Sequence, residues 1–305
     1  MAWRVFACAC FWLGACASAP PPAPHPDIET SDVALFYQVY DAAGGHPDAE
    51  ALDTDYLAKG SDGLRTLARL RDATGERIAA AVETSPEMYE KARTCADLLP
   101  SVKSRLDASL SALASYVPDA DFPPVTVAIG RGRPVGVGAP ETGIQIGLEA
   151  LCSVDFLNPD MEERFVTIIT HEYAHVQQAP ELAERDDLTV LEMSLIEGIA
   201  EFVTERTAGK ISYSHLLPLT AGHELEIETA FAADMDKTDL SDWLYNTGKK
   251  DPGDLGYWVG YRIAKAYYRA APDKRAAVAD MLAMTDAKAF LTASGWYPGI
   301  DLSGP

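Results

Sequence analysis

Two histidines stand four residues apart, at His171 and His175, and Glu172 directly follows the first of them. On a helix, side chains four residues apart lie on the same face, so the two imidazoles can bind one metal ion. Such a pair is typical of tetrahedral Zn²⁺ sites. Glu172 lies where its carboxylate can accept a proton from a water at that ion and pass it on. The spacing therefore predicts a zinc-dependent hydrolytic centre with Glu172 as general base.

A catalytic zinc needs a third protein ligand and one open position. The next expected helix offers Glu197 and Glu201, again four residues apart on an otherwise largely apolar segment, residues 195–202. Burial of two carboxylates there is costly unless each has a partner. We expect Glu197 to be the third ligand, with Glu201 as the alternative. In that arrangement Glu201 accepts the N–H of a ligand imidazole, and Gly198 lets the two helices approach closely.

In hydrolysis of a carbonyl compound the carbonyl oxygen becomes an oxyanion, which needs a hydrogen-bond donor. Among the later residues we expect Tyr261 to be that donor, followed by Tyr257, with His223 and Arg262 as alternatives. Aromatic residues in this part of the chain are more often members of the core. The assignment to a single residue therefore stays open at this stage.

Four segments of the sequence, in their order along the chain, resemble those of a known family. HExxH followed by a glutamate pair on the next helix resembles the gluzincin branch of zinc metallopeptidases. More narrowly, the chain resembles a bacterial family of predicted zinc-dependent proteases of unknown function. The shared segments are residues 144–149 (IQIGLE), 171–175 (HEYAH), 197–201 (EGIAE) and 256–261 (GYWVGY), and the match spans most of residues 30–295. The resemblance implies a gluzincin-like peptidase domain, a Zn²⁺ cofactor and a peptide or protein substrate.

The elements that must position these residues are mainly helices with a small β-sheet, an α+β fold. Helical patterns cover residues 32–43, 64–74, 85–116 with a break near Pro100, 159–178 and 188–208, with three or four more helices between 219 and 290. Strand patterns cover residues 125–129 and 144–148. We expect one solvated face on the 144–148 strand. It is either an exposed edge near the metal, to which an extended peptide could pair, or an ordinary sheet strand.

A glycine-rich stretch, residues 130–143, lies between the two expected strands. It lacks the GxxxxGK[ST] pattern and does not lead directly into a helix, which argues against a phosphate-binding loop. A flap or hairpin beside the site is the better interpretation. Elsewhere, Cys95 and Cys152 are either paired in a disulfide or two buried free thiols.

The N-terminus predicts export. Residues 1–15 have one arginine and a short apolar run, which is typical of a signal peptide. Leu-Gly-Ala before Cys16 resembles the lipobox of bacterial lipoproteins, and the alternative is simple secretion. Residues 16–30 then form a proline-rich tether and residues 31–305 the peptidase domain. We expect a lipid anchor at Cys16 on the periplasmic face of the outer membrane, or otherwise a soluble periplasmic or secreted protein.

Composition excludes several other classes of protein. With 25 Lys+Arg against 46 Asp+Glu, the formal net charge is −21, which argues against nucleic-acid binding and against docking on anionic lipid through a basic patch. Two rival functions remain, namely a non-catalytic zinc-bearing envelope scaffold or binding lipoprotein and a metal-free lipoprotein scaffold. Neither the substrate nor the oligomeric state can be read from the sequence.

Overall fold

The computed structural model describes residues 26–133, 135–139, 141–154, 157–183 and 185–303. The expected signal peptide, Cys16 and most of the expected tether lie outside these residues. Within them, none of the helices is long and apolar enough to cross a membrane.

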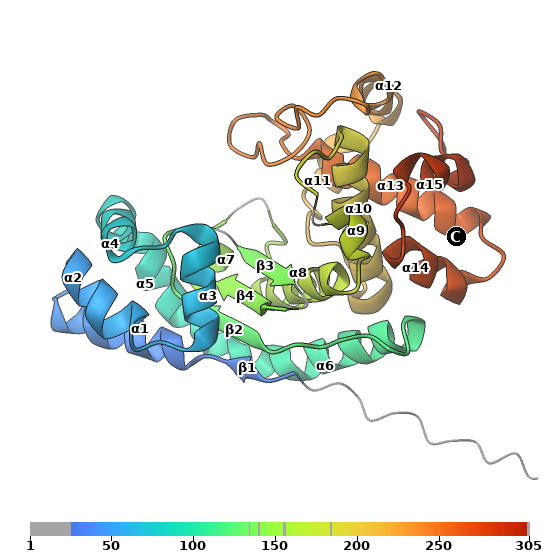
Figure 1. The fold of residues 1–305 in the computed structure, drawn as a ribbon. Helices are drawn as coiled ribbons and strands as arrows, with labels where there is room; N and C mark the ends of the chain where they lie inside the picture. Colours follow the sequence, from blue (N-terminus) through green and yellow to red (C-terminus); the bar gives the residue numbers. More distant parts are fainter. Residues whose placement is uncertain (1–25, 134, 140, 155–156, 184, 304–305) are drawn as a thin grey trace, which may run out of the picture.

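The described chain is mostly helical with one small sheet, so the expected mainly α, α+β fold is confirmed (Figure 1). The helices are α1 (Ser31–Ala42), α2 (Ala49–Ala51), α3 (Asp62–Arg71), α4 (Gly75–Thr84), α5 (Pro86–Cys95), α6 (Leu99–Tyr116), α7 (Leu148–Ser153), α8 (Met161–Val176), α9 (Pro180–Ala183), α10 (Val190–Ala208), α11 (Leu216–Thr220), α12 (Glu224–Asp234), α13 (Leu255–Ala270), α14 (Lys274–Leu282) and α15 (Ala287–Ser294), with a π-helix η1 (Leu52–Leu57) and a 3₁₀-helix η2 (Ala96–Leu98). The strands are β1 (Ile28–Glu29), β2 (Val125–Ala128), β3 (Gly136–Ala139) and β4 (Gly143–Gly147).

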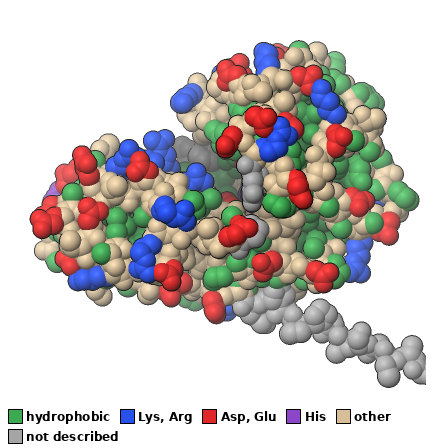
Figure 2. All heavy atoms as spheres, viewed as in Figure 1, with side chains coloured by type: hydrophobic (Ala, Val, Ile, Leu, Met, Phe, Trp, Pro, Cys, Tyr) green, Lys and Arg blue, Asp and Glu red, His purple; other side chains and the backbone are tan. Residues whose placement is uncertain are grey.

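Two lobes face each other across a notch, which is visible in the space-filling view (Figure 2). Helices α1 to α5 form one lobe beside the sheet, and α10 to α15 form the other (Figure 1). Helix α8 runs between them, packed against β3 on one side and α10 on the other. Most of the buried apolar side chains, from Val33 to Phe290, belong to one continuous core.

The sheet has the order β1-β2-β4-β3, with β1, β2 and β4 parallel and β3 antiparallel to β4. Strand β4 is therefore an interior strand, and all of its residues are buried. Of the two alternatives for residues 144–148, the ordinary sheet strand is right and the exposed edge is wrong, because the glycine-rich segment folds back and pairs with this strand, Gly136 opposite Ile146. The expected solvated face is also wrong. The edge strand is β3, so the expected hairpin beside the site is confirmed. At the other edge, β1 lies within the segment that we expected to be a tether.

A buried carboxylate holds the start of the glycine-rich segment. Glu149, in the first turn of α7, accepts the backbone N–H groups of Gly130 at 2.9 Å and Gly132 at 2.8 Å. A disulfide joins Cys95 at the end of α5 to Cys152 in α7, which answers the question that the sequence left open. Both interactions tie α7 to the N-terminal lobe and so support the hairpin that follows the loop.

The two helices that carry the chemical motifs begin two residues later than expected, at Met161 and Val190. The reason is that Asp160 and Thr189 are their N-caps, each accepting the N–H of the residue three positions later. Thr189 also forms a capping box, since Glu192 accepts its backbone N–H at 2.8 Å. These caps determine where each histidine and glutamate lies around its helix.

Helices α10 and α13 are in backbone contact at Gly198 and Gly260. A Cβ at Gly260 would lie 1.7 Å from the carbonyl oxygen of Ser194, and a Cβ at Gly198 would lie 2.1 Å from the carbonyl carbon of Gly260. Any larger residue would force the helices apart, which costs typically about 1–3 kcal/mol. The glycines of EGIAE and GYWVGY thus set the distance between the helix that carries Glu197 and the helix that carries Tyr257.

Candidate metal centre

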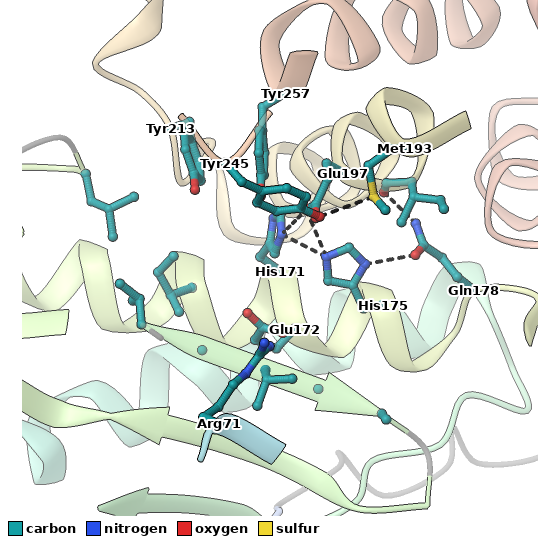
Figure 3. Close-up of a pocket in the computed structure, with 18 of the residues that line it drawn as sticks. Arg71, His171, Glu172, His175, Gln178, Met193, Glu197, Tyr213, Tyr245 and Tyr257 are labelled. Atoms are coloured by element: carbon teal, nitrogen blue, oxygen red, sulfur yellow. Dashed lines mark hydrogen bonds and ion pairs between the residues drawn. The ribbon is translucent and has the colours of Figure 1, made fainter. Parts of the chain in front are cut away.

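Three donor atoms converge between α8 and α10 (Figure 3). The Nε2 atoms of His171 and His175 lie 3.0 Å apart, and the Oε2 atom of Glu197 lies 3.3 Å and 3.2 Å from them, respectively. The histidines come from successive turns of α8, and the glutamate comes from the face of α10 that packs against it. The structure therefore brings together the three residues that the spacing predicted as ligands.

The tautomer of His175 follows from its neighbour Gln178. The side-chain N–H₂ of Gln178 donates to the carbonyl oxygen of Ile196 at 2.7 Å, so its Oε1 must be the atom that faces His175 Nδ1 at 2.8 Å. An amide oxygen can only accept, so His175 carries its proton on Nδ1. The lone pair of Nε2 is then directed at the centre.

The tautomer of His171 follows in the same way from Glu201. One oxygen of this carboxylate accepts the backbone N–H groups of Ser212 and Tyr213, at 2.7 Å and 3.2 Å. The other oxygen lies 2.8 Å from His171 Nδ1. A carboxylate cannot donate, so the proton again lies on Nδ1 and the lone pair of Nε2 faces inward. Glu201 occupies the supporting position that we expected for it.

The donor set fits a small divalent cation with nitrogen and oxygen ligands. Two imidazole lone pairs and a carboxylate oxygen point at one another, an arrangement that repels itself unless a positive charge lies between them. Tetrahedral zinc with bonds of about 2.0 Å has ligand atoms about 3.3 Å apart, close to the separations found here. The second oxygen of Glu197 is occupied, because it accepts the hydroxyl of Tyr245 at 2.8 Å.

The pKa values of the two histidines and of Glu197 reflect how closely these side chains approach one another. Burial lowers the pKa of each imidazole, but the neighbouring carboxylates outweigh burial, and the pKa of both His171 and His175 is raised. Burial raises the pKa of Glu197, but the two histidines outweigh it and the net shift is well below the usual range. Both directions show that the cluster favours positive charge at its centre.

Glu172 points into the same pocket and is only 8% exposed. Burial raises its pKa, and the charges of the two histidines and of Arg71 oppose that effect. Strand β3 passes close to it, since a Cβ at Gly136 would lie 2.6 Å from Glu172 Oε1 and one at Gly138 would lie 2.9 Å from its backbone oxygen. Only glycines at these positions let the edge strand pack against the glutamate without steric overlap.

The pocket that contains these groups encloses about 510 Å³. Its walls are strand β3, Arg71, the tyrosines Tyr213, Tyr245 and Tyr257, and apolar side chains including Leu157, Ile168, Met193 and Ile196. In Figure 3 the tyrosines lie on one side of the histidines, and Glu172 and Arg71 lie on the other. The ring of Tyr257 stacks on Tyr213 with 4.2 Å between centroids and lies 6.4 Å from the ring of His171.

The structure brings only one of the four expected oxyanion donors into this pocket, Tyr257. Tyr261 lies one helical turn further along α13, where its hydroxyl donates to Glu205 at 2.9 Å and accepts from Lys265 at 3.1 Å. His223 is exposed at the start of α12, and Arg262 is paired with the buried Glu228. The structure therefore does not support the role that we expected for Tyr261.

Three residues at the site were not identified from the sequence: Arg71, Gln178 and Tyr245. Tyr245 lies in the segment before α13 with a left-handed backbone, φ 56°. That segment is closed by Asn246 and Asp254, each of which accepts the backbone N–H of the other, at 2.6 Å and 2.7 Å. No periodicity signals such a loop. For Gln178, its place three residues after His175, just beyond the end of α8, was the available signal.

The fold and the site together define a mainly helical α+β protein with a buried His-His-Glu site suited to a metal ion. The family described as "Predicted Zn-dependent protease (DUF2268)" matches residues 149–292, a segment that contains all three candidate ligands and Glu172. The resemblance inferred from the sequence is thus confirmed over that segment. No curated protein and no solved structure matches the chain.

Zinc binding is expected to weaken as the pH falls. Both ligand imidazoles have raised pKa values in the metal-free protein, and each must lose its extra proton before it can bind the ion. Competition with a chromophoric chelator at pH 8 and pH 6 is expected to show at least about tenfold weaker binding at the lower pH. Affinity that is independent of pH, or Glu197→Ala protein that binds zinc as tightly as the parent, would contradict this assignment of ligands.

Proposed function

We propose that this protein is a zinc-dependent peptidase whose general base is Glu172. The observation that carries the proposal is that two imidazoles and the carboxylate of Glu197 converge in one open pocket. Glu172, which is not one of these three ligand candidates, lines the same pocket. A purely structural zinc site has four protein ligands and no open position. Among the described residues only three ligands meet here, and the fourth direction faces the pocket.

Each side chain has a distinct task in this mechanism. Zinc, when bound, would supply the Lewis acidity that polarises the scissile carbonyl and acidifies water. Glu172 accepts a proton from the attacking water and then delivers it to the leaving amine. Burial raises its pKa, which makes the carboxylate a stronger proton acceptor than an exposed glutamate. Glu201 and Gln178 hold the two imidazoles in the tautomer that binds metal.

Tyr245 is our candidate for the oxyanion donor, in place of Tyr261. Its hydroxyl donates to Glu197 Oε1 at 2.8 Å, and the other oxygen of Glu197 faces the two histidines. The hydroxyl therefore lies close to the expected position of the ion. The ring is 57% exposed, and it lies edge-on to Tyr257 at 6.3 Å, so the hydroxyl can turn toward a bound carbonyl. Tyr257 is the second candidate, and its stacking beside His171 also holds the imidazole in place.

The open edge of β3 supports a peptide as the substrate. Residues 136–139 line the pocket, and β3 pairs with β4 on one side only. An extended peptide could add its backbone hydrogen bonds to that free edge, and this would carry the scissile bond past Glu172.

The sharpest test is Glu172→Gln, which removes the proton acceptor and keeps the size of the side chain. We expect kcat to fall by about 10³-fold with zinc content unchanged, because general-base catalysis contributes roughly 10²–10⁴-fold. The measurement is digestion of an unbiased peptide library, read by mass spectrometry, with zinc measured in the same preparations. Full activity in the variant would rule out the mechanism. Stoichiometric zinc with no peptide cleaved by the parent protein would favour a non-catalytic zinc-bearing scaffold.

A pair of matched tyrosine variants tests the oxyanion assignment. Tyr245→Phe is expected to lower kcat by about 10²-fold with a smaller change in KM, because the lost donor acts mainly on the transition state. Tyr261→Phe, on the outer turn of α13, is the control and should retain kcat. A larger loss in Tyr261→Phe than in Tyr245→Phe would reverse the assignment.

We also propose that the protein is exported and anchored by a lipid at Cys16, on the periplasmic face of the outer membrane. The Cys95–Cys152 disulfide suits an oxidising compartment. Replacement Cys16→Ser is expected to move the protein from the membrane fraction to the soluble periplasmic fraction on cell fractionation. Membrane association that survives this substitution would exclude the anchor.

A further inference from the structure

Arg71 is a cation at the metal pocket that has no ion pair among the residues that the structure describes. It is the last residue of α3 and lines the pocket together with Glu172 and the ligands. Its Nε atom is buried and has no hydrogen-bond partner within the described part of the chain. Figure 3 shows its side chain directed toward Glu172 from the side opposite the tyrosines.

Two further arginines, Arg131 and Arg133, lie on the loop that leads to β3, and Arg131 contacts Arg71. Arg131 donates its Nε–H to the backbone oxygen of Arg71 at 2.8 Å, so the loop is attached to the end of α3. Burial lowers the pKa of Arg131, and so do the positive charges of Arg133, Arg77 and Arg71. Arg133 is exposed. The sheet side of the pocket therefore carries the positive charge of Arg71, and Arg131 lies directly behind it.

The arginines of this cluster differ from several others in this acidic chain. The net charge is −21, and three other arginines at described positions are paired with carboxylates, namely Arg105–Glu163, Arg185–Glu192 and Arg262–Glu228. In the cluster, Arg77 is paired with Asp72, while Arg71, Arg131 and Arg133 take part in no ion pair between described residues. Glu172 and Asp72 interact electrostatically with Arg71 and Arg131, but neither forms an ion pair with them, so the guanidinium of Arg71 can still bind an anion in the pocket.

Hydrogen bonds to a buried carboxylate hold the loop that carries Arg131 in place. Glu149 is fully buried, and it binds the backbone N–H groups on either side of Arg131, those of Gly130 and Gly132. The loop cannot move away to relieve the repulsion without leaving that carboxylate unpaired. The arginines are thus presented by a rigid support, as a binding subsite requires.

We infer that Arg71, supported by Arg131 and Arg133, forms a carboxylate-binding subsite, and that the preferred substrates are peptides with a carboxylate on the Glu172 side of the metal. This inference rests on the proposed peptidase function and names its substrate class. A guanidinium binds a carboxylate through two parallel hydrogen bonds, which gives orientation as well as affinity. The carboxylate can belong to an acidic side chain or to the C-terminus of the peptide, and the two sources share the same chemistry.

The first experiment measures binding without turnover. Zinc-loaded Glu172→Gln protein is titrated by fluorescence anisotropy with labelled peptides that carry Glu or Gln at one position next to the cleaved bond, each with a free or an amidated C-terminus. We expect the peptide with the relevant carboxylate to bind about tenfold more tightly. The Glu/Gln comparison identifies a side chain as the source, and the free/amidated comparison identifies the C-terminus.

Arginine variants show whether the preference comes from this subsite. Arg71→Gln in the same background is expected to abolish the tenfold preference, and Arg133→Gln, at an exposed position, is expected to reduce it. The matched control is Arg69→Gln, an exposed arginine on the same helix that does not line the pocket, and it should keep the full preference. A preference that survives Arg71→Gln, or its absence from the parent, would overturn the inference.

Cleavage separates this inference from the proposed function. In active protein, the ratio of kcat/KM for the acidic and neutral peptides should fall from about ten to about one on Arg71→Gln. Arg71 also acts on the pKa of Glu172, so the ratio, and not the absolute rate, is the decisive quantity. If no peptide is cleaved by any protein, the peptidase proposal fails, while the binding comparison still decides the subsite. Cleavage without acidic preference contradicts the subsite alone.

Discussion

The site depends on the orientation of two imidazole rings. An oxygen of Gln178 lies 2.8 Å from Nδ1 of His175, and an oxygen of Glu201 lies 2.8 Å from Nδ1 of His171, so both Nε2 atoms are directed toward one point where Glu197 adds a carboxylate oxygen. These atoms repel one another unless a positive charge lies between them. The rest of the fold maintains this unfavourable arrangement, because both histidines are held on a capped helix packed against a second helix with its own capping box.

The short distance between α10 and α13 is a second constraint on the site. The backbone contact of α10 with α13 at Gly198 and Gly260 brings the tyrosine-bearing helix close to the ligands. As a result Tyr257 stacks beside His171, while Tyr261, one turn along, is directed to Glu205. A helical turn of about 5.4 Å is enough to separate a residue that lines the pocket from a residue that is buried outside it.

The wall of the pocket formed by strand β3 also depends on glycine residues. Gly136 and Gly138 allow an edge strand to pass next to Glu172, and the N–H groups of Gly130 and Gly132 bind Glu149. The same loop carries Arg131 and Arg133 to the end of α3. The two walls differ in chemistry, since one presents phenol hydroxyls and the other presents a free backbone edge and positive charge. Such asymmetry would orient an extended chain with respect to the ion.

Local patterns in the sequence determined the fold class, the helices that carry the candidate ligands and the candidate ligands themselves. Four-residue spacing on a helix brings side chains together without help from the rest of the molecule, which is why His171, His175, Glu197 and Glu201 could be identified. Only the tertiary structure decided which residues from distant segments complete the pocket. Tyr245 reaches Glu197 across 48 residues of chain, and Arg71 approaches Glu172 from a different lobe. The pairing of Cys95 with Cys152 and the interior place of β4 likewise depend on long-range packing, which no local periodicity records.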